Sequence, residues 1–249
     1  MPLVGTRNLA AMAAAAPTVS AIGEEPWTFP GSQILQLMYE IDDETMTALI
    51  PPALHPTIPP TIVFVVTRVP ESPVGPFTLA EARIGARSGA RPRGLVVRAF
   101  CDSDDAISAL GRRWGYPLVK ADVVLEKRYD HIRGSVTSEG KCVLELALVN
   151  PEPISGNDLQ YLATLNLAHV DRGGTEAVRL VQVDPDFTFR SSDRGQPQLT
   201  TFDAAAWALD GARPVYAVSA SYAVADIQMP ELRYLVDPDK APLAAVERL

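Results

Sequence analysis

The hydrophobic positions of this sequence fall in short runs separated by turn residues. Thr61–Val69 is almost entirely β-branched and apolar, which is typical of a strand buried on both faces. Similar runs predict strands over Ile34–Ile41, Phe77–Gly85, Leu95–Cys101, Asp122–Arg128, Ile132–Ser138, Cys142–Val149, Ala177–Asp184, Asp186–Arg190 and Pro214–Pro230. Turns rich in Gly, Pro and Asp separate them, so successive strands are expected to pair in an antiparallel meander.

Helical signals are few and short. Asp42 and Asp43 can cap a helix over Glu44–Leu49, and the acidic run Asp102–Asp105 can cap a second helix that reaches Gly111. Residues 157–168 are expected to form a helix or an irregular covering segment. Residues 191–198 are expected to form a polar loop. The predicted fold is therefore mainly β (α+β), a large curved antiparallel sheet or β-barrel-like single domain with a few short helices.

The domain is expected to span residues 29–249, preceded by an N-terminal arm over residues 1–28. The Ala-rich stretch Leu9–Ala16 within the arm could resemble the core of a signal peptide. Only Arg7 precedes it, however, and Ala is weakly hydrophobic, so a short helix or frayed arm is favoured.

Composition narrows the class of protein. The 249 residues are 47% hydrophobic, enough for a sizeable core, and their net charge of -8 disfavours nucleic acid or an anionic membrane as a partner. No apolar run approaches the length of a membrane span. Because Cys101 and Cys142 are the only cysteines, a reducing compartment and a cytoplasmic location are expected.

The stretch Gly111–Ala121 holds the first of only four lysines, Lys120. It follows an aromatic-Gly-aromatic-Pro turn and precedes the apolar run Val123–Leu125, which places it at the start of a half-buried strand. Partial desolvation there could lower the pKa of Lys120 and free its amine for imine chemistry. The alternative is a surface lysine at a strand end.

The segment Gly111-Arg112-Arg113-Trp114-Gly115-Tyr116-Pro117 resembles the signature of the acetoacetate decarboxylase-like superfamily. The pattern Ser219-Ala220-Ser221 followed by Ala225-Asp226-Ile227 and Pro230 is similar to the superfamily's C-terminal signature, and the likeness extends from Phe29 to Asp237. It implies a β-rich fold, a homo-oligomer and a small-molecule carbonyl substrate. Acetoacetate decarboxylase is itself the standard example of a lysine activated by a second cation.

The polar site of that superfamily is replaced here. Where the resemblance expects two adjacent lysines this chain has Leu118 and Val119; Ser32 stands for an arginine, and Val65, after Phe64, and Leu79 stand for two glutamates. Lys120 and Glu81 each lie two residues beyond one of these positions and so on the same strand face. The sharpest hypothesis is that Lys120 is the amine nucleophile and Glu81 the acid/base. Alternatively, Glu81 is an ion-pair partner of Arg83 or Arg98.

Further candidates surround this pair. Arg113 could bind a substrate carboxylate or bridge to Asp104 or Asp105, while Trp114 and Tyr116 could wall a pocket or serve only the core. The expected substrate-binding residues are Ser32, Phe64, Val65, Leu79, Arg98, Arg113, Trp114, Tyr116 and Leu118. Neither a metal nor a cofactor is expected, because the three histidines lack ligand spacing and no phosphate-binding loop occurs.

These residues favour a lyase-type enzyme that acts on a 2-oxo acid, a β-keto acid or a hydrophobic derivative by aldol or dehydration chemistry, and not a true acetoacetate decarboxylase. Two alternatives stay open. One is a lysine-independent cyclase or isomerase of a hydrophobic substrate. The other is a non-catalytic protein that binds a small molecule in the same cavity.

Overall fold

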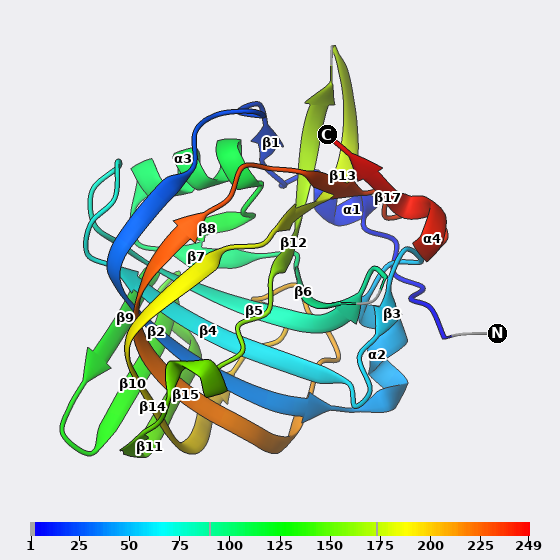
Figure 1. Cartoon of the computed structure of the whole chain (residues 1–249). Helices are drawn as coiled ribbons and strands as arrows, with labels where there is room; N and C mark the ends of the chain where they lie inside the picture. The colour runs from blue at the N-terminus through cyan, green and yellow to red at the C-terminus, as the bar shows by residue number, and fades with distance from the viewer. Residues whose placement is uncertain (1–2, 90, 173) are drawn as a thin grey trace.

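One curved sheet organises the computed structural model, which describes residues 3–89, 91–172 and 174–249. Figure 1 shows its long strands crossing the molecule, with short helices outside them. The strands are β1 Thr18–Val19, β2 Trp27–Ile41, β3 His55–Pro56, β4 Thr61–Val69, β5 Phe77–Arg87, β6 Pro92–Val96, β7 Ala99–Cys101, β8 Leu118–Lys120, β9 Asp122–Lys127, β10 His131–Ser138, β11 Lys141–Pro153, β12 Thr164–Arg172, β13 Thr175–Val183, β14 Asp186–Phe202, β15 Pro214–Met229, β16 Tyr234–Val236 and β17 Val246–Arg248. The helices are α1 Ala10–Ala13, α2 Asp43–Leu49, α3 Asp104–Trp114, α4 Pro242–Ala245 and the 3-10 turn η1 Gly156–Asp158.

Most neighbouring strands run antiparallel, as the meander pattern predicts. The pairs β2 with β4, β4 with β5, and β14 with β15 are examples. Among the described residues, three pairings are parallel: β1 with β12, β12 with β6, and β7 with β8. The mainly β fold is thus confirmed, with a mixed sheet in place of a purely antiparallel one.

The sheet buries apolar side chains on both faces, and neighbouring residues of one strand serve different faces. On β4, Phe64 packs into the larger hydrophobic cluster, whereas Val63 and Val65 pack into a second one. On β5, Ala80 and Ala82 belong to the first cluster and Leu79 to the second. The second cluster lies beneath α3 and surrounds a small cavity.

Helix α3 presents its apolar side to this second cluster. Ser103 caps its start by accepting a hydrogen bond from the Ala106 amide at 3.3 Å. Its last turn includes Trp114, so the helix extends one turn beyond the predicted end at Gly111. Gly115 then adopts a left-handed φ of 65°, and a Cβ there would lie 2.8 Å from the Ala168 Cβ. The sharp turn at the end of α3 directs the Tyr116 side chain toward the sheet.

The arm predicted over residues 1–28 packs on the domain in the described residues 3–28. Val19 is fully buried, and β1 pairs with β12. Arg113 of α3 binds the arm through an ion pair with Glu24. Its guanidinium carbon also lies 4.5 Å from the ring centre of Trp27 and 4.9 Å from the ring centre of Trp114.

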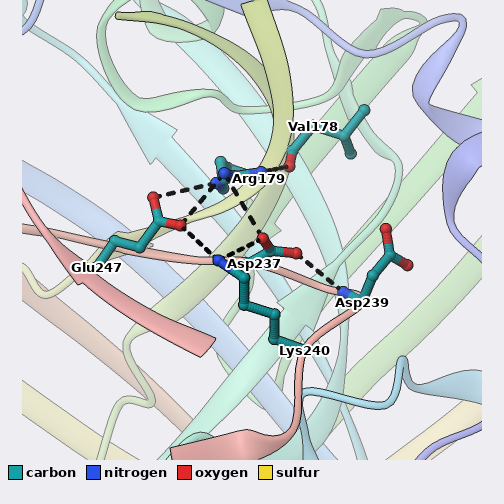
Figure 2. Close-up of polar contacts among 6 residues, drawn as sticks. All are labelled: Val178, Arg179, Asp237, Asp239, Lys240 and Glu247. Carbon is teal, nitrogen blue, oxygen red and sulfur yellow. Dashed lines mark hydrogen bonds and ion pairs between the residues drawn. The ribbon is translucent and has the colours of Figure 1, made fainter. Parts of the chain in front are cut away.

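A network of four charged side chains holds the C-terminal segment to β13 (Figure 2). Arg179 donates to both carboxylate oxygens of Glu247 at 3.2 Å, and its Nη2 lies 3.6 Å from Asp237. Lys240 lies 3.1 Å from Asp237 and 3.4 Å from Glu247. Two cations thus balance two carboxylates where β16, α4 and β17 meet β13.

Candidate functional site

A small cavity opens on the α3 side of the sheet, within the second hydrophobic cluster. Its volume is about 50 Å³, room for a few water molecules or a small ligand. Ten of its fifteen lining residues are apolar, contributed by β2, β4, β5, α3 and β15 among other segments: Phe29, Ile34, Val65, Val69, Leu79, Leu110, Pro185, Phe187, Ile227 and Met229. The five polar ones are Thr67, Glu81, Arg83, Tyr116 and Tyr161.

Glu81 and Arg83 form the charged centre of the cavity. Because they lie two residues apart on β5, both side chains leave the same face of the strand. Arg83 Nη2 lies 2.6 Å from Glu81 Oε2, and Arg83 Nε donates to Oε1 at 3.3 Å. Glu81 is 1% exposed. This ion pair confirms the alternative in which Glu81 partners Arg83.

The loop before β12 completes the anchoring of Arg83, whose Nη1 donates to the carbonyl of Leu162 at 2.8 Å. Burial alone would lower the pKa of Arg83, but the adjacent Glu81 carboxylate outweighs it, so the pKa is raised. The guanidinium therefore stays charged and fixed against the sheet.

Two tyrosine hydroxyls complete the polar part of the cavity. Burial raises the pKa of Tyr116, and the negative charge of Glu81 raises it further. The positive charge of Arg83 lowers it, but by less. Burial likewise raises the pKa of Tyr161. Both phenols therefore keep their protons at neutral pH and can donate hydrogen bonds.

The structure does not bring Lys120 and Glu81 together. Lys120 lies at the N-terminal end of α3, where its Nζ is 3.0 Å from Asp104 and donates to the Asp102 carbonyl at 2.9 Å. Its side chain is 53% exposed. Helix α3 lines the cavity through Leu110, which lies further along the helix than Asp104. The Asp104 carboxylate holds the amine at the surface, so the prediction that Lys120 enters the cavity is wrong.

Three of the expected substrate-binding residues line the cavity: Val65, Leu79 and Tyr116. Phe64 does not, because it precedes Val65 on β4 and so faces the larger cluster on the other side of the sheet. Leu118 packs against the second cluster without lining the cavity.

The remaining expected residues serve the scaffold instead. Ser32 is fully buried and donates to the Phe29 carbonyl at 3.1 Å, and Arg98 donates to the Ala206 carbonyl at 3.1 Å. Trp114 donates through Nε1 to the Pro230 carbonyl at 2.8 Å. Arg113 is taken up by Glu24, and not by Asp104, Asp105 or a substrate site.

Sequence reasoning did not assign Arg83, Thr67 or Tyr161 to the site. The signal for Arg83 was available, since it follows Glu81 at the spacing that keeps side chains on one strand face. Tyr161 lies in an irregular segment between η1 and β12, which offers no periodicity to interpret.

No group of three or more His, Cys, Asp or Glu side chains suited to a metal ion occurs in the described part of the chain. Cys101 is buried, and desolvation raises the pKa of its thiol to about 11, so it is a poor nucleophile. Across the same residues, no helix is long and apolar enough to cross a membrane.

The sequence profile described as acetoacetate decarboxylase (ADC) matches residues 11–238. The chain belongs to the acetoacetate decarboxylase family. A comparison with curated protein sequences found no match. Members of this family include enzymes, and the solved structures that resemble the chain include several of them.

Three of these structures illustrate the likeness. Acetoacetate decarboxylase from Legionella pneumophila subsp. pneumophila str. Philadelphia 1 aligns with a TM-score of 0.72 at 18% identity, over 86% of this chain and 88% of its own. The enduracididine biosynthesis enzyme MppR, complexed with the condensation product of pyruvate and imidazole 4-carboxaldehyde, gives 0.68 at 15%, over 86% and 90%. An acetoacetate decarboxylase-like enzyme from Sphingomonas wittichii RW1 gives 0.64 at 17%, over 86% and 96%. At these identities the likeness concerns the fold.

Proposed function

We propose that this member of the acetoacetate decarboxylase family is an enzyme that moves protons on a small carbonyl compound without forming a lysine imine. The observation that carries the proposal is the composition of the cavity wall. Among the described residues that line it are a carboxylate, a guanidinium and two phenols, but no lysine. Lys120, the amine nearest to the family signature, is bound to Asp104 outside it.

Enolisation of a carbonyl compound needs a base near the α-proton and a donor near the carbonyl oxygen. Glu81 is the carboxylate base, and Arg83 fixes its orientation through two hydrogen bonds. Tyr116 is the donor, because its raised pKa keeps the phenol protonated. An enol or enolate is the first intermediate of aldol, dehydration and isomerisation reactions, so this arrangement suits the lyase-type chemistry expected from the sequence.

The size and lining of the cavity favour a small, largely apolar substrate. A volume of about 50 Å³ and ten apolar lining residues leave little room for solvent. Low polarity around Glu81 strengthens its interaction with a partial charge that develops on the substrate. That MppR is complexed with a pyruvate condensation product is consistent with carbonyl chemistry on this fold.

Catalysis without an imine is distinguished from the Lys120 hypothesis by two measurements on one set of samples. The first is exchange of α-protons for deuterium in small ketones and 2-oxo acids, followed by NMR. The second is borohydride reduction followed by intact mass. We expect exchange without any mass gain from the parent protein, and unchanged exchange from Lys120→Ala.

Variants of the cavity then test the assigned roles. Glu81→Gln is expected to abolish exchange, and Tyr116→Phe to slow it by about 100-fold or more, the usual contribution of a positioned acid or base. Circular dichroism checks that each variant is folded. A borohydride adduct that disappears in Lys120→Ala would instead establish the imine.

The non-catalytic alternative also has an observation in its favour, because Arg83 occupies both oxygens of Glu81. Saturable binding of a ketone with no proton exchange under any condition would contradict the enzymatic proposal and support a binding protein.

A further inference from the structure

The charges that line the cavity cancel. Glu81 and Arg83 are its only ionised lining residues in the described chain, and they pair with each other at 2.6 Å. The guanidinium also donates to Leu162, so Nε, Nη1 and Nη2 each have a protein acceptor. A ligand entering the cavity therefore meets a neutral ion pair and not an unpaired cation.

An anionic ligand would be the third charge in this space. Its carboxylate would lie beside Glu81, and two carboxylates sharing one buried guanidinium repel each other. Apart from Arg83, the donors that line the cavity are the uncharged hydroxyls of Thr67, Tyr116 and Tyr161, so no unpaired cation offsets the cost of removing the anion from water. The cavity is thus electrostatically unsuited to the carboxylate of a 2-oxo or β-keto acid.

One hydroxyl that lines the cavity is left without a hydrogen bond. The Tyr161 hydroxyl oxygen is buried and has no hydrogen-bond partner of ordinary geometry among the described residues. The Ser221 hydroxyl lies near enough to lower the pKa of Tyr161, although burial raises it by more. The Phe187 ring lies 5.0 Å from that of Tyr161 and also lines the cavity. A buried donor without an acceptor is costly, which makes Tyr161 the natural partner of a ligand oxygen.

The surface beside the cavity has the same preference. A groove of about 390 Å³ adjoins it, since Met229 lines both and Pro185 of the cavity lies between two residues of the groove, Asp184 and Asp186. Three carboxylates line this groove, from Asp184, Asp186 and Glu231, against the guanidinium of Arg233, and Arg93 pairs with Asp184 at 3.3 Å. Counting Arg93, the carboxylates still exceed the guanidinium groups by one, so the groove beside the cavity disfavours anions.

We infer that the substrate is an uncharged ketone or ester, whose carbonyl oxygen accepts a hydrogen bond from Tyr161 and whose hydrocarbon part packs among the apolar lining residues. The inference rests on the proposed function only in placing a carbonyl compound in this cavity. Because a carbonyl oxygen has two lone pairs, it can accept from Tyr161, which binds the ligand, and from Tyr116, which donates to it as Glu81 removes the α-proton.

A matched pair of ligands tests the charge preference. 2-Pentanone and butanoate have the same shape, but a methyl group of the ketone is replaced by a charged oxygen in the acid. Affinities are measured with the full chain by titration in NMR. We expect 2-pentanone to bind at least about tenfold tighter than butanoate. Equal or tighter binding of butanoate would overturn the inference.

Two variants test the residues behind the preference. Tyr161→Phe removes only the donor and is expected to weaken 2-pentanone by about threefold to tenfold, with butanoate unaffected. Glu81→Gln leaves Arg83 without its counter-charge and is expected to improve butanoate binding by about tenfold or more. Unchanged 2-pentanone affinity in Tyr161→Phe would remove the assigned hydrogen bond.

Proton exchange in the same samples separates the two proposals. If 2-pentanone binds preferentially but its α-protons do not exchange, the proposed enzyme activity fails and the ligand class stands. If only the acids exchange their α-protons, the activity stands and the uncharged substrate fails.

Discussion

At the scale of single residues, Glu81 and Arg83 form a buried ion pair in a mainly apolar cavity. Removing one partner leaves the other charge unpaired in an apolar surrounding, which costs about 3–5 kcal/mol of unfolding free energy. We therefore expect Arg83→Met and Glu81→Leu each to destabilise the chain by about that amount in urea unfolding. The double variant should recover most of the loss, because no buried charge remains.

The exposed cross-strand pair of Arg133 and Glu145, 2.8 Å apart, is the matched control. Its side chains are 47% and 31% exposed, so Arg133→Met should change stability little. If the two single variants were no less stable than this control, or if their losses simply added in the double variant, burial of the ion pair would not be the source of its importance.

The same residues show how far the sequence leads. The period of two along β5 predicts that Leu79, Glu81 and Arg83 share a face, and the structure confirms it. The position of Lys120 could not be obtained that way. It depends on Asp104, which lies sixteen residues earlier in the sequence but only 3.0 Å away in space.

At the scale of elements, local signals predicted what local forces control. Thr61–Val69 is a strand with the expected bounds, and Asp42 and Ser103 cap α2 and α3. The segment 191–198, expected to be a polar loop, instead continues β14. Its polar side chains alternate along a largely exposed strand, and pairing with β11 and β15 decides its conformation. Residues 164–168 likewise belong to β12 and not to a helix.

The C-terminal element gives a prediction of pH dependence. Burial raises the pKa of Asp237, but hydrogen bonds from Lys240 and the Asp239 amide, with the charge of Arg179, outweigh burial and lower it overall (Figure 2). A lowered folded-state pKa stabilises the fold above the unfolded value, about 3.9, and this stabilisation is lost as pH falls through the folded value.

We therefore expect Asp237→Asn to lower unfolding free energy at neutral pH, and the difference from the parent to shrink below about pH 4. Urea unfolding at a series of pH values measures it. Asp239→Asn is the control, because that side chain is exposed and forms no ion pair in the described structure. A difference that stayed constant to the lowest pH would show that packing, and not the charge of Asp237, is responsible.

At the scale of the whole molecule, the cavity lies on one face of the sheet. The larger hydrophobic cluster packs on the opposite face, while the second cluster surrounds Glu81 and Arg83 beneath α3. β2, β4, β5 and β15 contribute residues to both clusters, whereas β9, β10 and β11 contribute only to the larger one. β5, which contains Glu81 and Arg83, is therefore held on its opposite face by Ala80, Ala82 and Ile84.

The homo-oligomer expected from the sequence can be assigned a surface at the same scale. The first part of β15 pairs with β2, but β14 joins its other edge only from Ser221 onward, among the described residues. Along this open edge Val215, Tyr216 and Val218 are 52%, 68% and 48% exposed, and no charged residue interrupts Pro214–Ala225. An uncharged apolar edge is a template for a second strand, and an antiparallel copy of itself satisfies two-fold symmetry.

We expect the parent chain to form a concentration-dependent dimer in sedimentation velocity, and Val218→Lys to shift it to monomer, because two-fold pairing brings the introduced charges close together. Val124→Lys is the matched control: Val124 is 44% exposed on β9, away from this edge. Dissociation by Val218→Lys alone would place the interface on β15, since both variants add the same charge to the surface. Equal dissociation by both would instead indicate general charge repulsion, and a monomeric parent at every concentration would contradict assembly through this edge.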